Sequence, residues 1–364
     1  MSDCPCPQGC HLLTLLSVAQ ARTGTGKTLA FLIPIVQNIL RNDPTLTERT
    51  RFVRGSPRVR NIRALVISPT RELAEQIAAE ARKLVQNTDI SVQTAVGGTG
   101  KREGLRRIQD ACHILVGTPG RLKDILSDPY SKIETPNLSM LVLDEADRLL
   151  EQGFEEEIRE IQGLLPDKRV TDRQTLLFSA TISREIMPVV RSTMKRDFQL
   201  VKTVRDDEQP THERVPQKIA NVRRLENLMP ALAELCTREI QNSTPERPFK
   251  AVIFYPTLTE VMLAAATMHN FKRPARSDPS QPCLPFSTQI FELHSDLSQR
   301  DRTSAADGFR RADSALLICS DVAARGMDFP GVTHVIQVGL PPSEEQYIHR
   351  IGRTARAGKT GEAW

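Results

Sequence analysis

Residues 18–32 read VAQARTGTGKTLAFL, a short apolar piece followed by a loop with two glycines and the start of a helical pattern. A strand, a glycine loop and a helix in this order bind nucleotide phosphates, because backbone N–H groups and the positive end of the helix face the anion. Lys27 is placed to reach the β- and γ-phosphates, and the Thr28 hydroxyl to bind Mg²⁺. The expected nucleotide contacts are Thr23, Gly24, Thr25, Gly26, Lys27 and Thr28. Ala21 stands where the general pattern has glycine, so a chance match is the alternative for this motif alone.

The alternation of strand and helix continues along the whole chain. Short apolar runs rich in β-branched residues are separated by longer amphipathic patterns such as 71–86. Runs of this kind are buried on both faces, which predicts parallel sheets covered by helices. The expected strands are 64–67, 114–116, 140–143 and 175–178, then 251–255, 289–293, 315–319 and 334–338. We therefore predict an α/β fold of two parallel-sheet domains in tandem, with a cleft between them.

Length and local composition suggest the domain boundaries. A chain of 364 residues exceeds one ordinary domain and suits two. The polar segment 201–216, with two prolines, has the composition of a linker. We expect an irregular leader at 1–17, a first domain at 18–200 and a second at 217–364, apparently truncated at its end. Cys4, Cys6 and Cys10 match no standard zinc spacing, so we favour an unstructured leader over a metal site.

Composition restricts the class of partner. The net charge is only +5, and aromatic residues make up 4% of the chain. A nucleic acid would therefore be held by locally placed Arg and Lys, through its backbone rather than by stacked bases. Seven scattered cysteines favour a reducing compartment. No apolar stretch is long enough to cross a bilayer, so we expect no membrane contact.

Residues 141–147 read LVLDEAD. The apolar run brings Asp144 to the carboxyl end of a strand, which is where ligands bind in open α/β sheets. Asp144 can hold the water shell of a metal, and Glu145 can orient or deprotonate an attacking water. The alternative is an ordinary acidic first turn of a helix, since acids suit that position.

Residues 349–358 read HRIGRTARAG. Arg350, Arg353 and Arg356 recur at every third position, which predicts one side of a short helix. A solvated basic face is the ordinary interpretation of such a run. A hydrolysis site without its own cation needs an arginine finger, however, and we favour Arg353 and Arg356 for that role.

Together these motifs resemble the DEAD-box family of RNA helicases over about residues 19–361. Ten motifs occur in the order typical of the family: ARTGTGKT, PTRELA (69–74), GG (97–98), TPGR (118–121), DEAD (144–147), SAT (179–181), VIFYPT (252–257), QRDR (299–302), SDVAARGMD (320–328) and HRIGRTAR (349–356). The resemblance implies two RecA-like domains that use ATP and Mg²⁺. It also implies RNA-stimulated ATP hydrolysis that unwinds short duplexes or remodels RNA and RNA–protein complexes.

The resemblance assigns roles to individual residues. Asp144 would serve the Mg²⁺ water shell together with Thr28, and Glu145 would position the attacking water. Asp328 would contact the ribose, while His349, Arg353 and Arg356 would complete the site from the second domain. The residues that would couple the two domains are Asp147, Ser179 and Thr181. The RNA-backbone path would be lined by Pro69, Thr70, Arg71, Gly98, Thr118, Gly120, Arg121, Thr257, Arg302 and Asp321.

The chain also departs from the family pattern. Residues 1–20 contain no aromatic–threonine–glutamine element of the kind that reads adenine in this family. A non-catalytic RNA-binding remnant is therefore an alternative, and an unrelated phosphate-loop NTPase such as a DNA translocase is a third. Segments 320–332 and 347–359 resemble fungal mitochondrial DEAD-box helicases that act in intron splicing, which implies a mitochondrial location. We expect a monomer.

Overall fold

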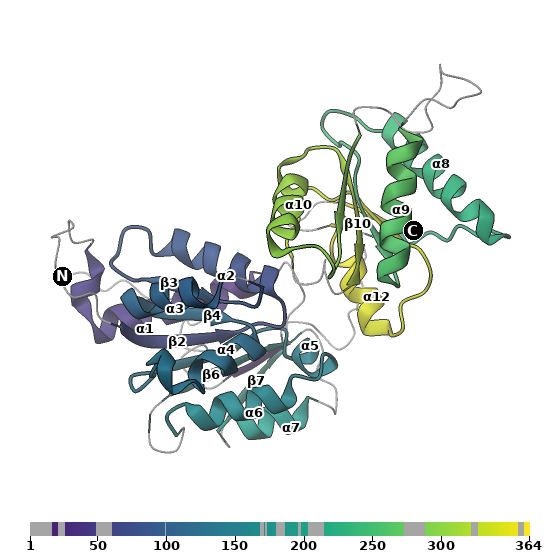
Figure 1. Cartoon of the computed structure of the whole chain (residues 1–364). Coiled ribbons are helices and arrows are strands. Elements are labelled where there is room, and N and C mark those ends of the chain that lie inside the picture. The colour runs from purple at the N-terminus through teal and green to yellow at the C-terminus, as the bar shows by residue number, and fades with distance from the viewer. Residues whose placement is uncertain are drawn as a thin grey trace, which may run out of the picture. The chain divides into compact units, whose positions relative to one another are not determined.

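The structure is a computed structural model that describes residues 17–20, 26–48, 60–98, 100–167, 171, 173–179, 186–195, 198–202, 215–272, 288–321, 327–355 and 360–364. The chain forms two compact units, Met1–Asp206 and Asp207–Trp364. Each unit carries its own sheet with helices on both faces (Figure 1).

Unit 1 contains a parallel sheet of seven strands in the order β3-β4-β2-β5-β6-β1-β7. The strands are β1 (Ser17–Gln20), β2 (Arg60–Ile67), β3 (Val92–Ala95), β4 (Cys112–Gly117), β5 (Met140–Leu143), β6 (Gln174–Ser179) and β7 (Gln199–Lys202). The predictions of β2, β4, β5 and β6 are confirmed. The short edge strands β3 and β7 were not predicted, because each is only partly buried and lacks a continuous apolar run. Val201 and Lys202, which we assigned to the linker, lie in β7.

Helices cover both faces of this sheet, as the apolar strands require. They are α1 (Lys27–Asn42), α2 (Arg71–Leu84), α3 (Lys101–Asp110), α4 (Pro119–Leu126), α5 (Ala146–Glu151), α6 (Glu155–Leu164) and α7 (Met187–Thr193). Side chains of α1 and α2 share one hydrophobic cluster with Met140 and Val142 of β5. Side chains of α3 to α7 share the other with Leu141 and Leu143. Alternate residues of one strand therefore enter two separate cores, which fixes the register of the sheet.

Unit 2 contains a parallel sheet of five strands in the order β12-β11-β8-β10-β9. The strands are β8 (Lys250–Tyr255), β9 (Gln289–Leu293), β10 (Ala315–Ser320), β11 (His334–Gln337) and β12 (Glu362–Ala363), and the helices are α8 (Leu228–Gln241), α9 (Leu258–Phe271), α10 (Gln299–Arg311) and α12 (Glu344–Ile351). All four strands predicted for this half are present. Helices α8 and α9 pack on one face of the sheet, and α10 packs on the other with Met327 and Phe329.

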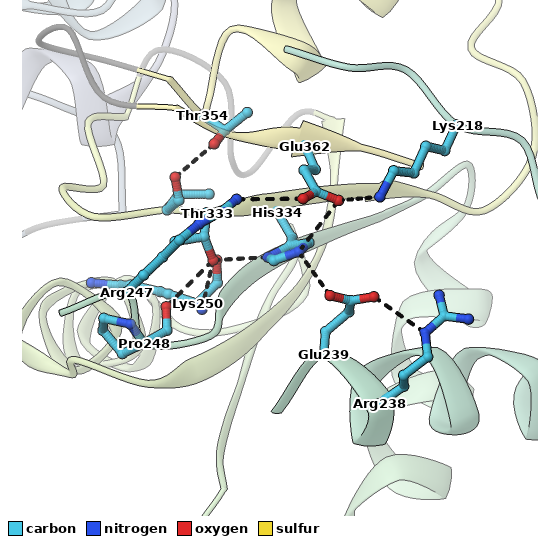
Figure 2. A network of polar contacts seen from close by, with 11 residues as sticks. Lys218, Arg238, Glu239, Arg247, Pro248, Lys250, Thr333, His334, Thr354 and Glu362 are labelled. Atoms are coloured by element: carbon cyan, nitrogen blue, oxygen red, sulfur yellow. Dashed lines mark hydrogen bonds and ion pairs between the residues drawn. The ribbon is translucent and has the colours of Figure 1, made fainter. Parts of the chain in front are cut away.

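The edge strand β12 was not predicted from the sequence. It pairs in parallel with β11, and the Lys218 N–H donates to the Ala363 carbonyl over 2.8 Å. A polar network holds the amino ends of β8, β11 and β12 to α8 (Figure 2). Its centre is the imidazole of His334, whose Nε2 lies 3.6 Å from Glu239 Oε2 and 3.9 Å from Glu362 Oε2. Two residues are too few to show a strand pattern, so only these tertiary contacts define the strand.

Candidate active site

The strand order of unit 1 sorts the predicted site residues into two groups along one edge of the sheet. The carboxyl ends of parallel strands lie on the same edge, so the loops that follow them lie side by side. The loops predicted to hold nucleotide or to couple the two domains follow β5, β6 and β1, which are consecutive in the sheet. The loops predicted to hold RNA follow β3, β4 and β2, which are also consecutive. One edge therefore carries two adjacent sets of motifs that are scattered in the sequence.

The phosphate loop ends where α1 begins. Gly26 is the N-cap of α1 and has φ 85°, a left-handed conformation that glycine adopts without strain. Lys27 and Thr28 follow as the first helical residues and are both half-buried. This places their side chains at the positive end of a 16-residue helix. Thr23, Gly24 and Thr25 lie outside the described residues.

Asp144 follows β5 and is buried, with 5% of its surface exposed. Its N–H donates to the Ile67 carbonyl over 2.9 Å, and its Oδ1 accepts from the Glu145 N–H over 3.0 Å. Burial and the charge of Glu145 raise the pKa of the Asp144 carboxyl to about 7, and the ammonium of Lys27 acts in the opposite direction. Lys27 is therefore close enough to affect Asp144 electrostatically. The predicted phosphate ligand and the predicted metal ligand belong to one electrostatic site.

Glu145 is held in an unusual conformation. Its φ is 48°, in the left-handed region, although it is not glycine. It is the N-cap of α5, and its Oε2 accepts a hydrogen bond of 2.7 Å from Nη1 of the buried Arg148. A strained residue of this kind at a strand-to-helix turn is typical of a functional position.

Asp147 and Ser179, two of the predicted coupling residues, are in contact. The Asp147 N–H donates to the Ser179 hydroxyl over 3.3 Å, and both residues are buried. Ser179 ends β6, which pairs with β1 through Gln20. This contact joins the acidic motif to the strand beside the phosphate loop. Thr181 lies outside the described residues.

The residues predicted for RNA on β2 and β3 pack against each other. Pro69 and Thr70 are buried at the end of β2, and the Thr70 hydroxyl caps α2 by accepting from the Leu73 N–H over 3.3 Å. Arg71 extends over Gly97, where an added Cβ would lie 3.1 Å from its Nη2. Gly98 beside it is exposed and has φ 73°. The glycine pair thus gives the arginine room next to an exposed stretch of backbone.

The turn after β4 forms a helix N-terminus at the same edge. Thr118 precedes α4 without a side-chain cap, and Pro119 occupies the first turn. Gly120 is exposed with no atom within 4 Å of a built Cβ, and Arg121 is half-buried beside it. Uncapped N–H groups and an arginine in one turn suit an anion such as a backbone phosphate.

In unit 2 the predicted RNA residues also follow the carboxyl ends of strands, but two of them are engaged in folding contacts. Thr257 follows β8 and caps α9 in a capping box with Glu260. Arg302, on α10 after β9, is 8% exposed. Both carboxylate oxygens of Asp321 accept from Arg350, over 2.7 and 2.6 Å. The Asp321 side chain therefore anchors α12 to the end of β10.

The arginine-rich motif does not form the single helix face that we predicted. Helix α12 ends at Ile351, with Gly352 as its C-cap. Arg353 lies beyond the helix and is 3% exposed, and its Nη1 donates to the Met327 carbonyl over 2.8 Å. Its Nε donates to the His349 carbonyl over 3.1 Å. The prediction of one helical face is wrong, because the glycine ends the helix between the first two arginines.

Among the other residues predicted to act on the nucleotide from unit 2, the structure describes His349 and Asp328. His349 is half-buried in the last turn of α12. Asp328 is exposed, and its carbonyl accepts from Arg310 over 3.1 Å. Arg356 lies outside the described residues. The roles of these residues toward a nucleotide stay predictions.

Sequence reasoning overlooked three residues at the two sites. Arg148 contacts Glu145, and the three-residue spacing of the two on a short helix could have indicated it. Arg350 was grouped with the other arginines, although its guanidinium is buried and pairs with Asp321. Gly117 ends β4, where a Cβ would lie 2.5 Å from the Ala95 carbonyl, and only the packing of β3 on β4 reveals this.

Two features are absent from the described residues. No group of three or more His, Cys, Asp or Glu side chains in this part of the chain could hold a metal ion unaided. Within the same residues, no helix has the length and apolar character needed to cross a membrane.

Each of the two units matches a known protein family. Residues 10–189 match the DEAD/DEAH box helicase family, and residues 231–358 match the helicase conserved C-terminal domain family. The chain is 55% identical over 351 residues to the mitochondrial ATP-dependent RNA helicase mss116 of Aspergillus fumigatus, a match that covers 95% of this chain and 52% of the relative. It is 52% identical over 354 residues to the mitochondrial ATP-dependent RNA helicase cyt-19 of Neurospora crassa, covering 95% of this chain and 54% of the relative.

A solved structure is also similar over both units. The DEAD-box helicase Mss116 bound to single-stranded RNA and UDP-BeF matches with a TM-score of 0.81 and 34% identity, covering 97% of this chain and 67% of that one. The chain spans about half the length of the two fungal relatives above.

Proposed function

This chain belongs to the DEAD-box helicase family, and we propose that it is an ATP-dependent RNA helicase. It hydrolyses ATP when RNA is bound, and uses the cycle to separate short duplexes or to remodel RNA and RNA–protein complexes. The observation that carries the proposal is the division of the unit 1 sheet edge. Motifs suited to phosphate and metal follow one set of adjacent strands, and motifs suited to a nucleic-acid backbone follow the other.

The residues present fit Mg²⁺ held mainly by the nucleotide. Mg²⁺ commonly uses one or two protein oxygens and takes the rest from phosphates and water. Asp144 supplies a buried carboxylate whose pKa is raised by burial and by the charge of Glu145, and a divalent cation would relieve that repulsion. Thr28 supplies a hydroxyl in the first turn of α1. When bound, the ion would neutralise charge on the phosphates.

The chain's own residues divide the remaining work. Lys27 binds the phosphates at the start of α1, and Glu145 orients the attacking water. The contact between Asp147 and Ser179 links this site to the end of β6. His349, Arg353 and Arg356 are proposed to act on the same nucleotide from unit 2, and Asp328 to contact its ribose. The proposed RNA contacts are to the backbone, which predicts weak sequence preference and strong salt dependence.

An ATPase assay with two variants tests the proposal. Wild-type turnover should rise when single-stranded RNA is added. Lys27→Ala should lose nucleotide binding, whereas Glu145→Gln should bind ATP and RNA but turn over at least about 100-fold more slowly, since a positioned acid or base contributes that much. Normal turnover by the glutamine variant would remove Glu145 from the mechanism.

The same assay separates the alternative functions. Binding of RNA without any turnover would identify a non-catalytic RNA-binding protein. Equal stimulation by DNA and RNA would favour a different class of NTPase, because the 2′-OH is what distinguishes the two polymers. We also propose a mitochondrial location, which the names of the two fungal relatives support, and a monomeric state. Fluorescence microscopy of the tagged protein and its sedimentation would test these two points.

A further inference from the structure

A buried arginine lies next to the acid proposed to orient the attacking water. Arg148 is the third residue of α5, and its side chain is 1% exposed. Its Nη1 donates to Glu145 Oε2 over 2.7 Å. Its Nε and Nη2 are buried and have no hydrogen-bond partner. The one side-chain hydrogen bond of this guanidinium is therefore donated to Glu145.

The buried ion pair of unit 2 shows what a stabilising arrangement looks like. Arg350 donates two hydrogen bonds to Asp321 and a third, of 3.3 Å, to Gln337 Oε1. Its guanidinium also lies 5.4 Å from the centre of the Phe254 ring. Arg148 has one bond where Arg350 has three.

This difference bears on the role of Arg148. Burying a cation removes its hydration, and the loss is recovered only if the remaining N–H groups find partners. A guanidinium with two unpartnered nitrogens recovers little, so an apolar side chain of similar size would stabilise the fold at least as well. The contribution of Arg148 to folding is accordingly small, and its direct effect is on Glu145.

The backbone of Glu145 is already fixed without the arginine side chain. Its N–H donates to Asp144 Oδ1 over 3.0 Å, and its carbonyl accepts from the N–H groups of Arg148 and Leu149 over 3.0 Å each. These bonds maintain the left-handed turn at φ 48° but leave the side-chain torsions undetermined. The bond from Arg148 acts on the side chain itself, at Oε2.

We propose that Arg148 is a positioning residue that holds the carboxylate of Glu145 in the orientation needed to engage the attacking water. The inference rests on the function proposed above. A hydrogen bond to one oxygen of a carboxylate restricts the side-chain torsions, so the range of positions of the second oxygen is narrowed before the substrate arrives. Misplacing a catalytic group by about 1 Å can cost about 100-fold in rate.

Steady-state kinetics on the whole chain with saturating RNA test this role. Arg148→Met should lower kcat for ATP hydrolysis by about 10- to 100-fold and change KM for ATP by less than about twofold. Arg148→Lys, which keeps a donor on the same helix face, should recover part of the rate. In a Glu145→Gln background, Arg148→Met should cause no further loss, because the group that it positions is gone.

A matched control is available in the same unit. Arg173 is 2% exposed, donates one bond of 3.0 Å to the Pro166 carbonyl and has an unpartnered Nε. It precedes β6, at the edge of the sheet opposite the site. Arg173→Met should change the melting temperature little and leave kcat unchanged.

The outcomes separate this inference from the proposed function. If wild type shows RNA-stimulated turnover while Arg148→Met has a normal kcat, or loses no more rate than Arg173→Met, the positioning role is wrong and the helicase proposal stands. Losses that add in full in the Glu145→Gln background would also overturn the role. If wild type shows no RNA-stimulated turnover, the proposed function itself fails. Should Arg148→Met not fold, Arg148→Gln replaces it, since glutamine is uncharged and shorter.

Discussion

Removing the partner of Arg350 should destabilise unit 2 strongly. Asp321→Ala deletes two short hydrogen bonds, of 2.6 and 2.7 Å, and leaves a guanidinium whose side chain is 1% exposed. Hydrogen bonds to charged groups contribute roughly 1.5–3 kcal/mol each. Breaking one side of a buried ion pair costs roughly 3–5 kcal/mol, because the other charge stays buried without its partner. We expect a loss of about 3–5 kcal/mol in the free energy of unfolding.

Urea denaturation followed by tryptophan fluorescence measures this loss. Trp364 is the single tryptophan of the chain and packs against the core cluster of α8 and α9, so its signal reports on unit 2. With an m-value of about 2 kcal/mol per molar urea, the midpoint should fall by about 1.5–2.5 M. Glu226→Ala is the control, because its pair with Arg224 is 69% and 74% exposed and should contribute nothing measurable.

A double variant distinguishes a buried charge from a simple loss of packing. Asp321→Leu combined with Arg350→Met removes both charges and keeps apolar volume, so it should recover most of the stability. A midpoint shift below about 0.5 M for Asp321→Ala would show that the pair contributes little to the fold. No recovery in the double variant would show that the loss does not come from a buried charge left without its partner.

Acid pH should weaken Mg²⁺-dependent nucleotide binding. Burial and neighbouring charges raise the pKa of the Asp144 carboxyl to about 7. Below that pH the carboxyl binds a proton and cannot hold the ion. Titration of a fluorescent nucleotide at pH 6 and 8 with fixed free Mg²⁺, and with EDTA as the control, checks this, and equal affinities would contradict it. Gly117→Ala should lower the free energy of unfolding of unit 1 by about 1–3 kcal/mol, because the new Cβ would lie 2.5 Å from the Ala95 carbonyl. Gly163→Ala in α6 places a Cβ with no atom within 4 Å, so it should stabilise the unit by about 0.5–1 kcal/mol. Thermal melts should rank Gly163→Ala above wild type and wild type above Gly117→Ala, and any other order counts against the packing argument. Burial lowers the pKa of His334 below its ordinary 6.5, so the unfolded state takes up the proton first and unit 2 should lose stability as pH falls from about 7 toward the lower folded-state pKa. In His334→Gln the urea midpoint should depend less on pH over that range. An unchanged pH dependence of the midpoint would exclude this imidazole as the cause.

Local patterns were sufficient for the central strands. Met140–Leu143 has the predicted bounds, because a run buried on both faces must be continuously apolar or β-branched. The edge strands β3, β7 and β12 gave no such signal, since an edge strand is stabilised by pairing with one neighbour and not by its own apolar content.

The site residues also fall into two groups, those that the sequence predicted and those that only the structure identified. Asp144 was predictable because an acid directly after a buried strand can only stand at the carboxyl edge of a parallel sheet. Residue spacing indicated which acids and glycines belong to which motif, but not which side chains meet. The pairs Arg148–Glu145 and Arg350–Asp321 came from the structure, the second across 29 residues of sequence.

The amino-acid sequence by itself determined the two parallel sheets, the order of the motifs and the family to which the chain belongs. Each of these can be read from short segments taken one after another along the chain, because hydrophobic period, turn chemistry and loop glycines act locally. Only the tertiary structure decided that the nucleotide and RNA motifs of unit 1 occupy separate halves of one edge, since strand order is set by long-range pairing. It also decided that Arg353 is buried and not part of a helical face, because the contacts that bury it come from Met327 and His349 on neighbouring segments.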